Sequence, residues 1–468
     1  MLFNSQEFLL FFVITTTLFF LLPHKVRWLL LLIASCVFYM FFKPEYILIL
    51  AFTILVDYYA GLKIESAPDQ QKRKNYLVLS LIANIGILAV FKYFNFINDN
   101  ITGLFNLTGH KNPIPYLKIL LPLGLSFHTF QAMSYTIEVY RGNQKAERHF
   151  GIYSLYVMFY PQLVAGPIER PQNVLHQFHE KKYFDYDRVL AGLRMMLLGF
   201  FKKIVIADRL GIYVDSVYRD VEHANSVTVL LALFFFAFQI YCDFSGYSDI
   251  ALGSAKVMGY DLMKNFDRPF MSKNITEFWR RWHISLSTWF NDYLFTPLVI
   301  KKRDWGKWGV VFAVLITFLI SGLWHGAGWP FLIYGLLYGI AVSFEFLTKK
   351  TRLKIAKKMP RIVYDNVSQA LTFAYVCLAL VFFRAGYFSK AILVFKTLLS
   401  FKFTFNLTQL CAEKGPLNLL ISFAVLGSFY FINKLYQSKF NFLFSFVAFF
   451  SIIILSKDVS HTFIYFQF

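Results

Sequence analysis

Apolar stretches close to the length of a membrane span recur from one end of this 468-residue chain to the other. A helix needs roughly 20 apolar residues to cross the hydrocarbon core of a bilayer. Hydrophobic residues make up 57% of the chain and charged residues only 16%, whereas soluble domains carry about 25% charged residues. The 57 phenylalanines exceed what one soluble core can bury. These features exclude a soluble globule, a disordered chain and a disulfide-stapled secreted module, and they predict a protein embedded in lipid.

We predict an all-α polytopic membrane protein with about 12 transmembrane helices, built as a single membrane domain over residues 1–468. The predicted spans are 8–22, 28–42, 46–60, 76–94, 119–140, 190–206, 227–241, 310–323, 331–347, 371–383, 417–432 and 440–455. The apolar segment 153–165 is short and contains Pro161, so we expect it to enter the membrane and return. The polar stretch 95–118 and the acidic stretch around Asp215 are expected to be outer loops.

The formal net charge of +20 is expected to lie in cytoplasmic loops, because such loops collect Lys and Arg. The basic segments 61–75, 264–307 and 348–361 then lie inside, and both termini lie outside. This placement accounts for the charge without a nucleic-acid partner. The first apolar stretch has no basic region before it and no small-residue cleavage site, so we expect it to be retained. The four cysteines, Cys36, Cys242, Cys377 and Cys411, have neither metal-ligand nor disulfide spacing and are expected to be core residues.

His325 lies in a Ser-Gly-Leu-Trp-His-Gly-Ala-Gly run, 321–328, at the end of a predicted span. A neutral imidazole can take a proton from a hydroxyl near pH 7, which acyl transfer to an alcohol requires. The neighbouring glycines allow backbone or substrate to approach closely. The alternative is a histidine that is hydrogen-bonded and only packs.

The segment 278–293 is predicted to be one helix with two stripes. An aromatic stripe contains Trp279, Trp282, Leu286, Trp289 and Tyr293, and a polar stripe contains Arg280, His283, Ser287 and Asn291. Arg280 and Arg281 could hold the phosphates of coenzyme A or of a phosphopantetheine arm. The alternatives are packing or interface anchoring for the tryptophans and membrane orientation for the arginines.

Four further polar residues, Asp243, Asp249, Gln162 and Glu169, follow apolar stretches. His and Cys do not accompany the aspartates at ligand spacing, so we predict no metal site. We expect these groups to satisfy one another or buried arginines and to shape a cavity. The sequence contains no phosphate-binding loop, dinucleotide fingerprint or nucleophile elbow. An energy-driven pump and a redox enzyme are therefore unsupported.

Several motifs, in order along most of the chain, resemble the membrane-bound O-acyltransferase family. They are Asp-Phe-Ser-Gly-Tyr-Ser-Asp-Ile-Ala-Leu-Gly at 243–253, Asn-Phe-Asp-Arg-Pro-Phe at 265–270, Phe-Trp-Arg-Arg-Trp-His-Ile-Ser-Leu-Ser at 278–287 and Ser-Gly-Leu-Trp-His-Gly at 321–326. Segments 161–171 and 382–385 add to the match. The chain is most similar to the branch of alginate and peptidoglycan O-acetyltransferases and teichoic-acid D-alanyl transferases.

The resemblance implies that His325 is the essential histidine and His283 the second one. It also implies a ring of tilted helices around a thin central cavity, with the donor entering from the cytoplasm and the acceptor from outside. The expected donor is acetyl-CoA or an acyl-carrier-protein thioester, held with the help of Trp324 and the polar stripe, and no cofactor is bound permanently. The expected partner is an extracytoplasmic esterase-like acyltransferase, and the expected location is the bacterial inner membrane.

The last residues, 463–468, resemble a terminus in which a tyrosine, here Tyr465, receives the acyl group. An aromatic interface anchor is the alternative. The segment 291–300 lacks the arginine and the glycines usual in the family, so its loop is expected to differ.

We therefore expect an O-acetyltransferase acting toward a cell-envelope polysaccharide, peptidoglycan or an alginate-like polymer. The alternatives are another acceptor, such as teichoic acid or a lipid, and a transporter without covalent chemistry.

Overall fold

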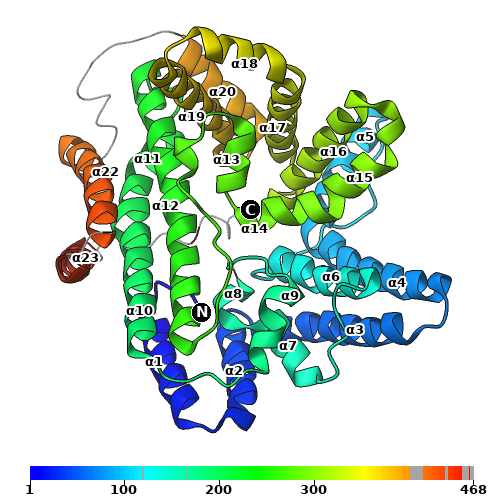
Figure 1. The fold of residues 1–468 in the computed structure, drawn as a ribbon. Helices are drawn as coiled ribbons and strands as arrows, with labels where there is room; N and C mark the ends of the chain where they lie inside the picture. Colours follow the sequence, from blue (N-terminus) through cyan, green and yellow to red (C-terminus); the bar gives the residue numbers. More distant parts are fainter. Residues whose placement is uncertain (119–120, 165, 401–414, 438–440, 456–462, 464–468) are drawn as a thin grey trace. The chain divides into compact units, whose positions relative to one another are not determined.

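The computed structural model describes residues 1–118, 121–164, 166–400, 415–437, 441–455 and 463, and the regular elements in these ranges are helices (Figure 1). The chain forms two compact units, Met1–Met196 with Tyr247–Met263, and Leu197–Gly246 with Lys264–Phe468. The single domain over residues 1–468 stays a prediction.

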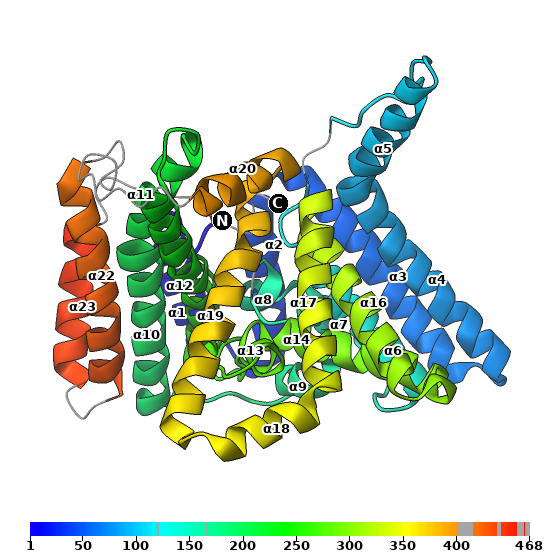
Figure 2. The same cartoon turned by 90° about the horizontal axis from the view of Figure 1, so that it is seen from above.

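The first unit contains the N-terminal helices. They are α1 (Gln6–Leu21), α2 (His24–Met40), η1 (Pro44–Tyr46), α3 (Ile47–Ser66), α4 (Gln70–Leu88), η2 (Ala89–Tyr93), α5 (Phe94–Leu107), α6 (Leu125–Arg141), α7 (Phe150–Met158), α8 (Tyr160–Leu163), α9 (Pro171–Val174), η3 (Leu175–Phe178) and most of α10 (Tyr186–Phe200). α3, α4 and α6 pack together (Figures 1 and 2). The buried carboxylate of Asp57 accepts hydrogen bonds from Ser80 (2.6 Å) and Asn84 (2.9 Å) between α3 and α4. This pairing allows a carboxylate inside an apolar helix.

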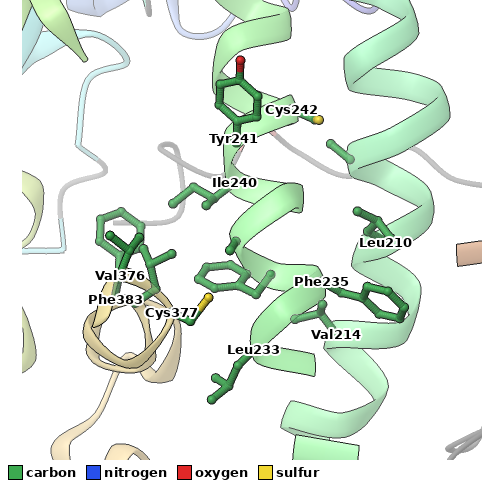
Figure 3. Packing of buried hydrophobic residues seen from close by; sticks show 14 of the residues in the cluster. Leu210, Val214, Leu233, Phe235, Ile240, Tyr241, Cys242, Val376, Cys377 and Phe383 are labelled. Carbon is green, nitrogen blue, oxygen red and sulfur yellow. The ribbon is translucent and has the colours of Figure 1, made fainter. Parts of the chain in front are cut away.

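The second unit contains the remaining elements. They are η4 (Phe201–Ala207), α11 (Asp208–Arg219), α12 (Ser226–Met258, which continues into the first unit), η5 (Pro269–Met271), α13 (Ile275–Arg281), α14 (Ile284–Phe290), η6 (Asn291–Phe295), α15 (Thr296–Lys301), η7 (Arg303–Trp305), α16 (Lys307–His325), α17 (Trp329–Leu347), α18 (Lys349–Lys358), α19 (Arg361–Ala385), α20 (Phe388–Leu399), α22 (Gly415–Tyr436) and α23 (Asn441–Leu455). Its apolar core includes residues of α11, α12 and α19, among them Val214, Phe235 and Phe383 (Figure 3).

Close helix contacts in this unit depend on glycine. A Cβ atom at Gly322 of α16 would lie 2.2 Å from the carbonyl oxygen of Phe331, and one at Gly335 of α17 would lie 2.2 Å from that of Phe318. Small residues of this kind let membrane helices approach until their backbones touch. The Gly322 contact confirms the close backbone approach expected beside His325.

Among the described residues, seven helical segments are long and apolar enough to cross a membrane, and two shorter helices are also apolar. The seven are Pro44–Ser66, Gln70–Leu107, Ser226–Met258, Lys307–His325, Trp329–Leu347, Arg361–Ala385 and Gly415–Tyr436. The multi-pass, all-helical character is therefore confirmed, whereas the count of about 12 spans stays a prediction.

Three local predictions are wrong. The expected loop 95–118 contains α5, because the helix of α4 continues through the π-turn η2. The expected loop around Asp215 contains the helix α11. The predicted span 227–241 does not end before Asp243: α12 continues to Met258, since Asp243 is paired with a buried lysine and Gly246 allows close packing on Gly199.

Candidate active site

His325 is the last residue of α16, and the backbone turns extended at Gly326. Its side chain is buried. The imidazole meets three aromatic rings edge to face, with centroid distances of 5.0 Å to Trp324, 5.8 Å to Tyr334 and 5.7 Å to Phe383. The end of a span thus holds this ring inside the protein, as the sequence predicts.

His283 lies at a break between two short helices, which corrects the prediction of one helix over 278–293. α13 ends at Arg281, Trp282 is extended, and His283 has a left-handed backbone with φ 44° before α14 begins at Ile284. A left-handed conformation is uncommon for a residue with a side chain, costs about 1–3 kcal/mol and is concentrated at functional sites. The two-stripe pattern therefore applies only within each short helix.

The segment before η5 holds this break in place. Asn265 accepts a backbone hydrogen bond from Ile284 (2.9 Å), and Asp267 donates one to the carbonyl of Arg281 (2.9 Å). These bonds satisfy backbone groups that a continuous helix would have satisfied internally. The motif at 265–270 thus supports the loop that carries His283.

Trp324 brings the two histidines into one cluster. Its ring centroid lies 5.7 Å from that of His283 and 5.0 Å from that of His325. Phe244 of α12 contacts His283 from another direction, at 4.7 Å. Burial, and secondarily the nearby His325, lowers the pKa of His283 well below its usual range, so this ring is neutral at physiological pH.

A cleft of about 860 Å³ lies in the second unit, and its lining includes Trp279, Ile284 and Ser321, which are close in sequence to the two histidines. This volume lies within the range of about 300–1,000 Å³ typical of ligand sites. Three cationic side chains, Arg280, Lys349 and Arg352, line the cleft together with Ser287 and Asn291. Ser321 also lines it and precedes His325 by one turn of α16.

Glu345 lines the cleft with a buried carboxylate, and this carboxylate bonds to groups of the protein itself. It accepts hydrogen bonds from the backbone amides of Ile275 (2.6 Å) and Thr276 (2.9 Å) at the start of α13. A helix N-terminus favours a negative charge. Glu345 therefore anchors α13, the helix that carries Arg280.

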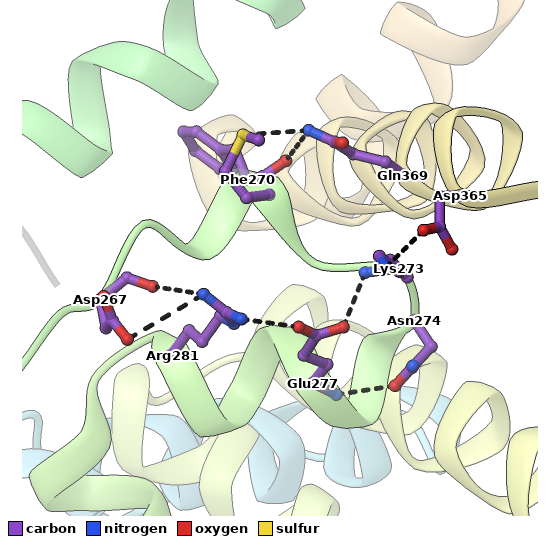
Figure 4. A network of polar contacts seen from close by, with 9 residues as sticks. Asp267, Phe270, Lys273, Asn274, Glu277, Arg281, Asp365 and Gln369 are labelled. Atoms are coloured by element: carbon purple, nitrogen blue, oxygen red, sulfur yellow. Dashed lines mark hydrogen bonds and ion pairs between the residues drawn. The ribbon is translucent and has the colours of Figure 1, made fainter. Parts of the chain in front are cut away.

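Arg281 takes part in a different set of contacts. Its guanidinium pairs with Glu277 (2.8 Å) and lies 4.0 Å from Asp267, in a network that also includes Lys273 and Asp365 (Figure 4). Among the described residues around the cleft, Arg280 but not Arg281 forms part of the lining. The two adjacent arginines thus have different surroundings.

Three of the four predicted polar residues, Asp243, Gln162 and Glu169, contact different partners. Asp243 forms an ion pair with Lys203 (2.7 Å), which also pairs with Asp208 (2.8 Å), so the cation is a lysine and not the expected arginine. Gln162 donates to the carbonyl of Tyr156, and Glu169 accepts from the amide of Met263. Burial raises the pKa of Glu169 to about 7. Asp249 is half-buried on α12.

Two residues of the site were missed by the sequence reasoning. Lys203 could have been found, because it is an ionisable residue within the predicted span 190–206. Asn265 could not have been assigned a contact with His283, since nothing local indicates that position 265 meets position 283. Tyr465 and Cys411 lie outside the described residues.

In a comparison with known proteins, residues 149–389 match the model of the membrane-bound O-acyltransferase family. The chain is 35% identical over 416 residues to the probable alginate O-acetylase of Pseudomonas aeruginosa, covering 88% of this chain and 77% of that protein. It is 36% identical over 393 residues to the peptidoglycan O-acetyltransferase of Helicobacter pylori, covering 78% and 72%. It is 28% identical over 268 residues to the teichoic acid D-alanyltransferase of Bacillus subtilis, covering 54% and 66%.

The matched region contains both histidines and the cleft-lining Arg280. The relatives are named as acyl-transferring enzymes, which decides against a transporter without covalent chemistry. Because the family model matches more than half of the chain and the relatives cover most of it, this multi-pass membrane protein belongs to the membrane-bound O-acyltransferase family and is an O-acyltransferase.

Proposed function

We propose that this protein moves an acetyl group from a cytoplasmic thioester across the inner membrane toward hydroxyl groups of a cell-envelope polysaccharide. The observation that carries the proposal is a cleft lined by Arg280, Lys349 and Arg352 and also by Ser321, which lies one helical turn from His325. A phosphopantetheine arm has an anionic phosphate at one end and a thioester at the other. The cationic side chains suit the phosphate, and the thioester would then lie on the side of Ser321 and His325.

The chemistry requires a base and a leaving thiol. The acceptor hydroxyl attacks the thioester carbonyl while the imidazole of His325 takes the hydroxyl proton. The new C–O bond forms, the C–S bond breaks, and the imidazolium returns the proton to the departing thiolate. His283 and Trp324 would hold the reacting groups beside His325, and Arg280 would hold the donor. No resident cofactor or metal is needed for this step, since the thioester supplies the driving force.

The proposed acceptor follows from the similarity to an alginate O-acetylase and a peptidoglycan O-acetyltransferase. Teichoic acid is the alternative, because a D-alanyltransferase for that polymer is also similar, and a lipid acceptor is a further one. A final transfer by an extracytoplasmic esterase-like partner fits a chain that delivers acyl groups to the outer face. The basic segments 61–75, 264–307 and 348–361 support a cytoplasmic side for these loops, with both termini outside.

Transfer by the reconstituted protein tests this function. With labelled acetyl-CoA or acetyl-carrier protein as donor, we expect label on an added polysaccharide fragment or on the C-terminal peptide that contains Tyr465, detected by mass spectrometry. Tyr465→Phe should abolish the peptide adduct if the tyrosine hydroxyl relays the acyl group. Turnover without an adduct would argue against the relay, and no transfer from either donor would argue against the function.

Replacing Arg280 with alanine is expected to raise the KM for the donor about five-fold with little change in kcat. Loss of one exposed charge-assisted contact costs about 1 kcal/mol, and Arg280 is exposed at the cleft. Steady-state kinetics at varied donor concentration and at two salt concentrations checks this. Arg303→Ala is the matched control, because Arg303 is exposed and pairs with Asp304. An equal KM for both variants would contradict the assignment of the cleft to the donor.

A further inference from the structure

The side-chain oxygen of Asn265 lies at the centre of three contacts with the loop that carries His283. Asn265 Oδ1 accepts hydrogen bonds from the backbone amide of Ser285 (3.2 Å) and from its hydroxyl (2.8 Å), and it lies 3.2 Å from Nδ1 of His283. Asn265 is 2% exposed, and His283 and Ser285 are fully buried. This arrangement places a fixed polar atom against one nitrogen of the ring.

The amide of Ser285 identifies that polar atom as an oxygen. Nitrogen and oxygen of an asparagine side chain are normally assigned from their partners. A backbone N–H can only donate, so the atom that faces it must be the acceptor Oδ1. The same oxygen faces Nδ1 of His283, and a hydrogen bond there requires Nδ1 to carry the hydrogen. In a neutral imidazole the other nitrogen, Nε2, then holds the lone pair.

The surroundings of His283 favour the neutral ring. Phe244 of α12 and Trp324 of α16 pack against it, and among the described residues the imidazole of His325 in α16 further disfavours a positive charge on it. Burial disfavours a charged imidazolium. Asn265 is a neutral amide and therefore supplies an acceptor without adding a negative charge.

Asn265 also holds the backbone on which this geometry depends. Its carbonyl oxygen accepts from the amide of Ile284 at 2.9 Å, directly after the left-handed His283. The backbone of Asn265 thus fixes the position of the loop, and its side chain fixes the ring of His283. A residue without a side-chain acceptor would keep the first contact and lose the second.

We propose that Asn265 is a positioning residue that fixes His283 in the Nδ1–H tautomer, so that Nε2 is presented as an acceptor to the reacting groups. In this state His283 orients the O–H of the acceptor or the S–H of the released thiol, and it cannot donate a hydrogen bond from Nε2 to the thioester carbonyl. The inference rests on the proposed function, because it assigns His283 a task in that reaction.

The test compares Asn265→Ala with Asn265→Asp in the full-length protein. Asn265→Ala is expected to lower kcat about 10- to 100-fold, as for outer partners of metal-bound histidines, with the donor KM within about two-fold. Asn265→Asp keeps an acceptor but adds a carboxylate, which stabilises the imidazolium and raises the pKa of His283. The acidic limb of its pH–rate profile should therefore move to higher pH, with activity recovered on the alkaline side.

Asn433→Ala is the matched control, because the side chain of Asn433 in α22 donates to the carbonyl of Phe429 in its own helix. Its kcat and pH profile should match the parent. An unmoved acidic limb in Asn265→Asp would overturn the proposal even if Asn265→Ala fails to fold. His283→Ala separates the two hypotheses. If His283→Ala keeps full acyl transfer, the role of His283 in the proposed function is wrong. If His283→Ala loses transfer but Asn265→Ala keeps the parent kcat, only the positioning role of Asn265 is wrong.

Discussion

Replacing His325 with alanine is expected to lower the rate of acyl transfer about 10²- to 10⁴-fold, the usual contribution of a positioned general base. Without the imidazole, no general base would take the proton of the attacking hydroxyl. Donor binding should persist, since the cationic side chains that line the cleft, Arg280, Lys349 and Arg352, remain. Single-turnover transfer and equilibrium binding of the donor, measured on the same purified protein, separate the two effects.

His223→Ala is the control for this substitution, because His223 is exposed and pairs with Asp220 between α11 and α12. That variant should transfer acyl groups at the parent rate. His325→Gln preserves much of the side-chain volume among Trp324, Tyr334 and Phe383 and should be as inactive as the alanine variant. Transfer near the parent rate in either His325 variant would refute its role as general base.

Replacing Lys203 with alanine is expected to destabilise the second unit by about 3–5 kcal/mol, because it leaves buried charges without their counter-ion. Lys203 is 1% exposed and lies 2.7 Å from Asp243 and 2.8 Å from Asp208. Without the ammonium group, the two carboxylates would face each other in a desolvated site. One of them would have to bind a proton or the segment would have to open.

Thermal unfolding in detergent micelles measures this effect. The matched control is Lys273→Ala, which breaks the exposed pair with Asp365 at 2.7 Å and should cost only about 0–1 kcal/mol. Adding Asp243→Asn to Lys203→Ala should restore part of the lost stability by removing one of the unpaired charges. Equal melting temperatures for Lys203→Ala and Lys273→Ala would contradict the ion-pair account.

Much of the helical framework follows from apolar runs and their flanking residues. The predicted spans 310–323 and 331–347 correspond to α16 and α17, and the short segment 153–165 is broken between α7 and α8 as Pro161 suggests. Hydrophobic length is a local property, so a window of sequence is enough to detect it. Boundaries were less accurate where a polar residue inside a helix has a distant partner, as at Asp243.

The site was only partly predictable for the same reason. His325 could be identified because it ends a predicted span in a glycine-rich run. Arg280 and His283 could be identified because they lie in the same basic segment. Periodicity over 278–293 suggested one helix, but Asn265 and Asp267 bond to the backbone on both sides of Trp282–His283 and stabilise a break. Periodicity reports which faces are apolar and does not report competing hydrogen bonds from another segment.

By itself, the sequence determined that this chain is a helical membrane protein with the motifs of an acyltransferase, because apolar length, charge placement and residue order are written along the chain. Only the tertiary structure decided that Trp324 joins His283 to His325, that Arg280 lines the cleft while Arg281 pairs with Glu277, and that Lys203 neutralises Asp243. The contacts of His283 with Trp324 and of Lys203 with Asp243 join residues far apart in the chain, and their energies depend on burial and geometry that no local pattern encodes.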